Sequence, residues 1–228
     1  MTWWIADYWQ SGQTVLLASW IFWVIASICL HELGHGYAAL WEGDDTPRVT
    51  GHMTWNPMVH MGGMSLVIFL LVGFAWGLMP VDPSRFRHRR WGDAIVALAG
   101  PLVNLILALV LLTGAGLLAG FVLGRENAPD WGERVFTFLF TGGWLNLALM
   151  ALNLLPVPPL DGSRILASVS HGYRRLLMNP NAGIIGFGLF MLVFWMTPFG
   201  RVAIGLLQSA ALLWAGTVQG LVLWMTGG

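Results

Sequence analysis

Long apolar runs separated by short polar segments dominate this sequence. Because a membrane-spanning helix needs about 20 predominantly apolar residues, the pattern is typical of a polytopic helical membrane protein. The runs predicted to span a membrane lie at residues 14–40, 94–123, 134–155, 182–198 and 202–225. A further apolar run covers residues 61–80, but glycines at positions 62, 63, 73 and 77 interrupt it.

Two loops rich in arginine indicate how these segments are oriented. Residues 81–91 contain four arginines and residues 163–181 contain three, and such loops mark the cytoplasmic side of a membrane. If the first span also ends on that side, residues 61–80 must begin and end there. We therefore predict that residues 61–80 re-enter as a hairpin that reverses near Gly73. The alternative is a full crossing, which would place the first arginine loop outside.

Residues 48–55 differ from the apolar runs because hydrophobic and polar residues alternate there. Val49, Met53 and Trp55 would share one face of an extended chain, so the pattern predicts a short strand or hairpin near the membrane surface. Such a strand could bind an extended peptide by strand addition. The alternative is an ordinary surface hairpin, which has the same pattern. The predicted fold class is an all-α polytopic membrane protein with about five transmembrane helices, a re-entrant or sixth segment, and a small membrane-associated β-hairpin after the first span.

Composition narrows the class of protein further. The chain is 57% hydrophobic and only 10% charged, which excludes an ordinary soluble domain. Its net charge is zero, and nothing indicates a nucleic-acid partner, whereas membrane lipid is an expected one. We expect residues 1–228 to form a single membrane-embedded domain, with a core at about 14–162 and C-terminal helices at 182–226.

The sequence His31-Glu32-Leu33-Gly34-His35 lies in the last third of the first predicted span. On a helix, His31 and His35 share one face, so that two imidazole nitrogens can bind one metal ion, and Glu32 lies close enough to act on a metal-bound water. The alternative is a hydrogen-bonded pair of core histidines. Ionisable residues within a span are costly and usually functional, which favours the metal site.

Asp161 is a candidate for the third ligand. It follows Pro156, Pro158 and Pro159, which prevent a regular helix and favour an extended backbone. From residue chemistry alone, a metal ligand and a helix N-cap are equally good interpretations of Asp161. The remaining histidines, His52, His60, His88 and His171, lie in polar loops and are predicted to be solvated surface residues.

The sequence resembles the site-2 protease family of intramembrane zinc metalloproteases, as a short prokaryotic member without PDZ or CBS domains. The motifs that carry this resemblance are His-Glu-Leu-Gly-His at residues 31–35, Ala-Gly-Pro-Leu-Val-Asn at 99–104, and Asn-Leu-Leu-Pro-Val-Pro-Pro-Leu-Asp-Gly at 153–162. The resemblance implies that His31, His35 and Asp161 bind one zinc ion and that Glu32 is catalytic. It also implies that Asn153 helps hold the peptide or its oxyanion, while Asn104 matches a recurrent residue of less settled role.

The implied function is an intramembrane zinc endopeptidase that hydrolyses single-span membrane protein substrates near the cytoplasmic side. The implied location is the prokaryotic inner membrane, which the protein crosses several times. Alternatives are a zinc-binding membrane transporter, a catalytically inactive scaffold or a non-proteolytic zinc hydrolase. Glu32 argues against the scaffold, because a structural metal site does not need that carboxylate.

Overall fold

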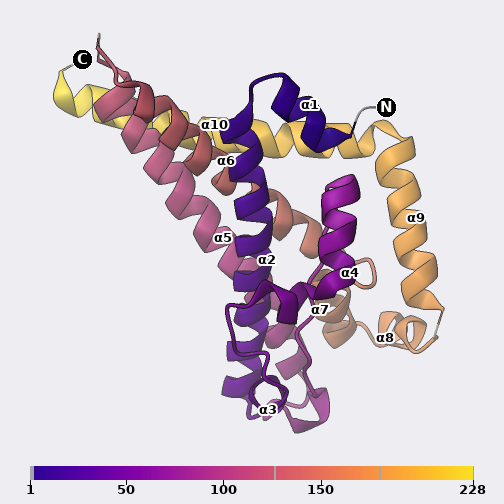
Figure 1. Ribbon diagram of the computed structural model, residues 1–228. Coiled ribbons are helices and arrows are strands. Elements are labelled where there is room, and N and C mark those ends of the chain that lie inside the picture. The colour runs from indigo at the N-terminus through magenta and orange to yellow at the C-terminus, as the bar shows by residue number, and fades with distance from the viewer. Residues whose placement is uncertain (1–2, 126, 180, 228) are drawn as a thin grey trace.

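The computed structural model describes residues 3–125, 127–179 and 181–227, and its regular elements are helices (Figure 1). A short helix α1 (Trp4–Gln10) precedes the long helix α2 (Thr14–Glu42), which ends at Gly43 in a left-handed conformation (φ 97°) that glycine favours. The elements that follow are α3 (Thr46–Val49), α4 (Pro57–Val72), η1 (Pro83–Arg85), α5 (Gly92–Leu118) with its π-helical continuation η2 (Ala119–Leu123), α6 (Asp130–Asn153), α7 (Asp161–Val169), α8 (His171–Leu177), α9 (Ala182–Met196) and α10 (Pro198–Thr226).

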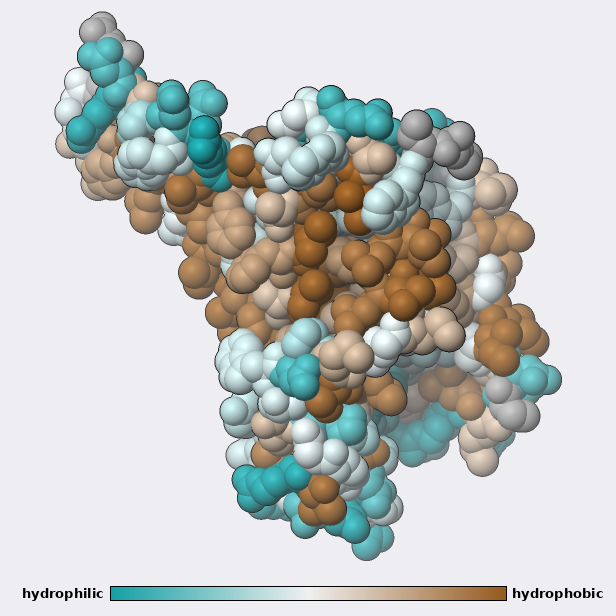
Figure 2. Space-filling view, viewed as in Figure 1, coloured by the Kyte–Doolittle hydropathy of each residue, from teal (hydrophilic) through white to brown (hydrophobic). Residues whose placement is uncertain are grey.

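Four helices within the described residues are long and apolar enough to cross a membrane, namely α2, α5 with η2, α6 and α10. Helix α9 has 15 residues and is too short by itself, but α8 and α9 together would form a fifth, bent span. Figure 2 shows hydrophobic side chains gathered across the middle of the molecule, with hydrophilic residues above and below them. This distribution is the one expected of a helical membrane protein.

Glycines allow the core helices α2, α5 and α6 to approach closely. A Cβ atom added at Gly34 of α2 would lie 2.9 Å from the Val103 side chain of α5. One added at Gly142 of α6 would lie 2.4 Å from the Trp23 ring of α2. Small residues at interfaces are the usual means of packing helices in lipid, where the hydrophobic effect between helices is weak.

Helix α4 and the segment that follows it form a hairpin. The helix has 16 residues and is kinked at Gly62 (φ 67°, ψ 167°). Even a straight helix of this length, about 24 Å, would be shorter than the hydrocarbon thickness of about 30 Å. It ends at Gly73 (φ 78°), and residues 74–82 then return in an extended conformation. The Ser65 hydroxyl donates to the Trp76 carbonyl (2.8 Å) and accepts from the Trp76 amide (2.9 Å), which holds the returning segment against α4. The chain therefore reverses at Gly73, as predicted.

The predicted β-hairpin at residues 48–55 is wrong, because the part of the chain described by the structure contains no strand. Residues 46–49 form the helical turn α3 instead, and Gly51 (φ 73°) belongs to the turn that follows. The Asp44 carboxylate accepts hydrogen bonds from the Thr46 amide (3.0 Å) and hydroxyl (2.5 Å), which stabilises this turn. An alternating pattern this short forms a strand only where a partner strand is available, and none is present in the described chain.

Candidate metal centre

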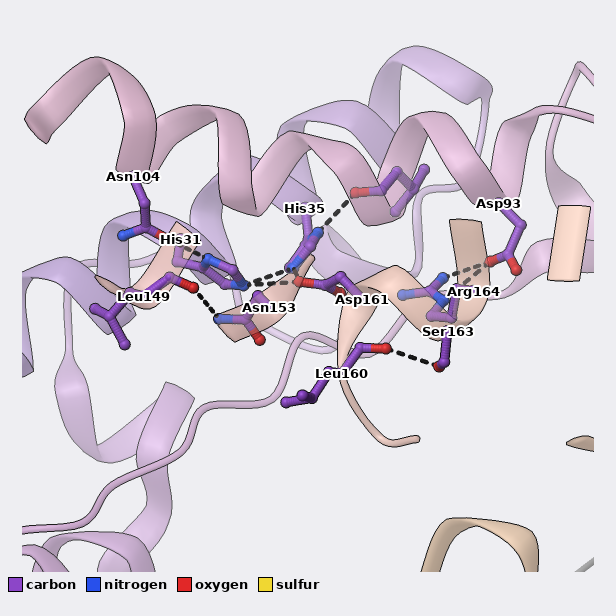
Figure 3. Close-up of polar contacts among 11 residues, drawn as sticks. His31, His35, Asp93, Asn104, Leu149, Asn153, Leu160, Asp161, Ser163 and Arg164 are labelled. Carbon is purple, nitrogen blue, oxygen red and sulfur yellow. Dashed lines mark hydrogen bonds and ion pairs between the residues drawn. The ribbon is translucent and has the colours of Figure 1, made fainter. Parts of the chain in front are cut away.

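Helix α2 presents His31 and His35 on one face, toward α5 and α7 (Figure 3). Their Nε2 atoms lie 3.0 Å apart and their rings are nearly perpendicular, at 86°. Both side chains are buried. The helical spacing of four residues thus brings the two imidazoles together, as predicted.

Asp161, the first residue of α7, approaches this pair from the other side. Its Oδ2 atom lies 3.1 Å from Nε2 of His31 and 3.3 Å from Nε2 of His35. The connection from α6 to α7 turns back so sharply that a Cβ atom at Gly162 would lie 2.2 Å from the Leu154 carbonyl oxygen. A glycine is therefore needed where the proline-containing segment delivers Asp161 to the histidines.

The chemistry of the three side chains fits a zinc ion. Nδ1 of His35 lies 2.7 Å from the Val96 carbonyl and Nδ1 of His31 lies 2.5 Å from Oδ1 of Asn104, so each Nδ1–H donates and each Nε2 keeps a lone pair. Two such lone pairs and a carboxylate oxygen, all within 4.8 Å of one another, repel unless a cation lies among them. Tetrahedral zinc with ligand distances of 2.0–2.2 Å separates its ligand atoms by about 3.3–3.6 Å. The observed separations of 3.0, 3.1 and 3.3 Å reach the lower limit of this range or lie slightly below it.

Close contact with α5 shapes the metal centre. A Cβ atom at Gly100 would lie 2.5 Å from Nε2 of His35 and 2.6 Å from Nε2 of His31. Any larger residue would therefore occupy the space into which the ligand atoms project. Gly100 precedes Pro101 in the predicted motif, and its role here is steric.

Glu32 lies beside the histidines and is buried. The extended segment that returns from α4 passes directly over it, because a Cβ atom at Gly77 would lie 2.5 Å from Oε1 of Glu32 and 2.8 Å from Ile28. Gly77 thus allows the backbone to cover the carboxylate without displacing it. This places a carboxylate next to the candidate ligands but outside the cluster of atoms that could bind a metal.

Asn153 is the last residue of α6, and its Nδ2 atom donates to the Leu149 carbonyl of the same helix (3.0 Å). One amide hydrogen is used in this bond and the other stays available as a donor. Figure 3 shows Asn153 on the side of the cluster where α6 ends. Its role in catalysis stays a prediction.

The other four histidines lie outside the metal cluster. His88 donates from Nδ1 to the buried carboxylate of Glu42 (2.9 Å), and His52 bonds with Thr50. The prediction of a solvated surface residue is wrong for His60, which is buried and donates from Nε2 to the Thr54 carbonyl (2.6 Å). The hairpin of α4 covers His60, and this packing is not visible in the local sequence.

Sequence reasoning missed two contributors to the site. Asn146 of α6 bonds to Asn104, and Arg164 of α7 donates from Nη2 (2.6 Å) and Nε (3.1 Å) to Oδ1 of Asp93 at the start of α5. The ion pair ties the helix that carries Asp161 to the helix that covers the histidines. A lone asparagine in an apolar run was a signal for Asn146, whereas Arg164 was attributed only to a cytoplasmic loop.

Comparison with known proteins defines the family. The model of peptidase family M50 matches residues 19–129 and 116–196. The Bacillus subtilis protein named "Putative zinc metalloprotease YwhC" is 36% identical over 179 residues, which cover 78% of this chain and 80% of that protein. "Zinc metalloprotease MJ0392" of Methanocaldococcus jannaschii is 28% identical over 193 residues, or 81% of this chain and 46% of that protein. No solved structure matches the chain.

The chain therefore belongs to peptidase family M50, which confirms the resemblance to the site-2 proteases. It is an integral membrane member of this zinc metalloprotease family, with zinc as its cofactor. The chain spans four-fifths of the Bacillus relative and about half of the archaeal one.

Proposed function

We propose that this protein is an intramembrane zinc endopeptidase that cleaves single-span membrane proteins near the cytoplasmic side of the prokaryotic cell membrane. In this proposal His31, His35 and Asp161 hold one zinc ion, Glu32 transfers protons and Asn153 supports the oxyanion. The observation that supports it best is the convergence of the three ligand atoms, two of which belong, like Glu32, to a helix of membrane-spanning length. In this proposal residues 1–228 form one membrane-embedded protease domain, with the catalytic core at about residues 14–162.

The depth of the site supports cleavage within the membrane. His31 precedes the last residue of α2 by eleven positions, which corresponds to about 17 Å along the helix axis. Helix α2 has 29 residues, about 43 Å, and exceeds the hydrocarbon thickness of about 30 Å by about 13 Å. If this excess is shared equally between the two ends, His31 lies about 10 Å inside the hydrocarbon region, and a peptide bond must enter that region to reach the site. A membrane protein substrate already has its chain there.

The chemistry follows from the positions of the side chains. Bound zinc supplies Lewis-acid activation of a water molecule and of the scissile carbonyl. The Glu32 carboxylate takes the proton of the attacking water and returns it to the leaving amide nitrogen. The free amide hydrogen of Asn153 stabilises the oxyanion, and loss of one such donor typically costs about 100- to 1000-fold in rate.

The orientation of the protein is inferred from its two arginine loops. Both lie at the end of the molecule where α2 ends and α5 begins, since the Arg87 amide donates to the Glu42 carbonyl (2.7 Å) and Arg164 pairs with Asp93. Basic loops of this kind favour the cytoplasmic side. We therefore place the metal-binding end of the molecule toward the cytoplasm.

Substitution of Glu32 by glutamine tests the activity. Wild type and Glu32→Gln are purified in detergent, zinc per chain is measured, and a panel of single-span substrates is assayed for cleavage. We expect one zinc in each protein and a loss of cleavage of at least about 100-fold in the variant, because general acid–base catalysis contributes that much or more. Equal cleavage by the two proteins would contradict the proposal.

A matched control uses the exposed carboxylate of Glu133, in the first turn of α6. Glu133→Gln makes the same chemical change away from the metal centre and should cleave at the wild-type rate. Zinc binding without cleavage of any panel member by the wild type would favour a transporter or another zinc hydrolase.

Cysteine labelling tests the orientation. Ser84 in the first arginine loop and Ala128 in the loop before α6 are exposed, and each is replaced by cysteine in a Cys29→Ser background. A membrane-impermeant maleimide should label Ser84→Cys only in inverted vesicles and Ala128→Cys only in intact cells. The reverse pattern would place the metal-binding end outside.

A further inference from the structure

A chain of buried amides connects His31 to the interior of the three-helix core. Nδ1 of His31 lies 2.5 Å from Oδ1 of Asn104, and Nδ2 of Asn104 lies 2.8 Å from Oδ1 of Asn146. Nδ2 of Asn146 lies 2.8 Å from both the Ser27 hydroxyl and the Gly142 carbonyl. The side chains of Asn104, Asn146 and Ser27 are completely buried, so that each polar atom depends on these partners.

The direction of each hydrogen bond in this chain is determined by one backbone group. The Gly142 carbonyl can only accept, so the end of the Asn146 amide that faces it must be the NH2 group. The opposite end of Asn146 is then its oxygen, which requires that Asn104 present its own NH2 group to Asn146. Asn104 therefore presents its oxygen to His31, and Nδ1 of His31 must carry the proton.

The consequence for His31 is a free lone pair on Nε2, the atom that faces His35 and Asp161. His35 reaches the same tautomer by a simpler route, since its Nδ1 donates directly to the Val96 carbonyl (2.7 Å). A backbone carbonyl cannot reverse its role as acceptor, whereas an asparagine side chain can turn over. The tautomer of His31 therefore depends on the neighbours of Asn104, whereas the tautomer of His35 does not.

We propose that Asn146 is a positioning residue for metal binding, which acts through Asn104 to hold His31 in the tautomer that offers Nε2 to zinc. The proposal rests on the assignment of His31 as a zinc ligand in the proposed function. Without Asn146, Asn104 loses the acceptor that holds its NH2 group and can turn that group toward His31. The tautomer then favoured carries its proton on Nε2, where it opposes metal binding.

Zinc affinity is the direct test of Asn146. Asn146→Leu keeps the approximate size of the side chain and removes both ends of the relay. The apparent dissociation constant for zinc, measured by competition with a chelator on the full-length protein in detergent, should rise by about 10- to 100-fold, the usual effect of losing an outer partner of a metal-bound histidine. The matched control is Thr141→Val, a nearly isosteric change at another buried polar residue of α6, which should leave the affinity unchanged.

A second substitution separates a relay from a merely structural role. Asn104→Asp places a carboxylate against His31, and a carboxylate accepts at both oxygens whatever its neighbours do. In the double variant Asn104→Asp/Asn146→Leu, we therefore expect most of the zinc affinity lost in Asn146→Leu to return. If Asn146 has only a structural role, the losses of zinc affinity caused by Asn104→Asp and by Asn146→Leu should add in the double variant. That result would overturn the proposal.

Thermal unfolding provides a readout that does not involve cleavage. Asn146→Leu should reduce the increase in Tm produced by zinc more than it reduces the Tm of the zinc-free protein, and an equal reduction of both would contradict the relay. His31→Ala distinguishes failure of the underlying assignment, because unchanged zinc affinity in that variant would show that His31 is not a ligand. Unchanged affinity in Asn146→Leu alone would refute only the relay.

Discussion

The helices around the metal centre and the helices at the end of the chain are similarly apolar, but they pack differently. Helix α2 buries fourteen residues, including Ser27, His31, Glu32 and His35, while α9, described along its whole length, buries Phe190 alone. An apolar cavity of about 510 Å³ lies between α9 and the proline-containing segment before Asp161, which approach each other at Gly186 and Pro158. Polar networks and glycine contacts thus make the core specific, whereas lipid can solvate the exposed apolar surface of the outer helices.

The largest effect is expected from adding a single methyl group to the closely packed core. Gly100→Ala would place a Cβ atom 2.5 Å from Nε2 of His35, so the ligands must move. Overpacking costs about 1–3 kcal/mol, and a displacement of about 1 Å at a reacting centre can cost about 100-fold in rate. We expect cleavage to fall by at least that factor and zinc content to fall below one per chain.

The same substitution in α10 provides the control. Gly216 has no atom within 4 Å of an added Cβ, so Gly216→Ala should retain zinc and activity. Its stability should rise by up to about 1 kcal/mol, because alanine is the better helix former. Full activity in Gly100→Ala would show that the metal centre is less closely packed than the structure indicates.

An intermediate effect is expected from the ion pair that holds α7 against α5. Arg164→Gln removes the charge that pairs with Asp93, and because both side chains are partly exposed the pair is worth about 1 kcal/mol or less. That energy corresponds to about a fivefold weaker zinc affinity if it is used entirely to position Asp161. Chelator competition measures this change.

Arg85→Gln is the matched control, since Arg85 pairs with Asp45 on the exposed surface and not with the helix that carries Asp161. It should not change zinc affinity. A similar decrease in both variants would indicate a general effect of lost positive charge.

The smallest effect is expected on the exposed face of α9. Ile184 is 79% exposed, so Ile184→Ala should change the free energy of unfolding in detergent by less than about 0.5 kcal/mol. Leu145→Ala of α6, where the side chain is 6% exposed, should cost about 2–5 kcal/mol. Comparable losses in Tm for the two variants would show that α9 is covered by something more specific than lipid or detergent.

Local patterns were sufficient where a single element determines the outcome. The predicted spans 14–40, 94–123 and 134–155 agree closely with α2, with α5 and η2, and with α6. Continuous hydrophobicity of this length has few structural alternatives. Residues 48–55 were misassigned, since their alternating pattern needs a partner strand to become a strand. His60 was misplaced because the hairpin of α4 buries it.

What the sequence determined by itself is the pairing of His31 with His35, which follows from the geometry of a few consecutive residues. The reversal at Gly73 follows instead from the two arginine loops, which require residues 61–80 to begin and end on one side, and from a glycine that permits the turn. Only the tertiary structure shows that Asp161, 130 residues further along the chain than His31, lies next to both His31 and His35. It also connected Asn146 to His31 through Asn104 and covered Glu32 with Gly77. These contacts depend on how closely the helices approach one another, and that distance is set by small residues on separate elements.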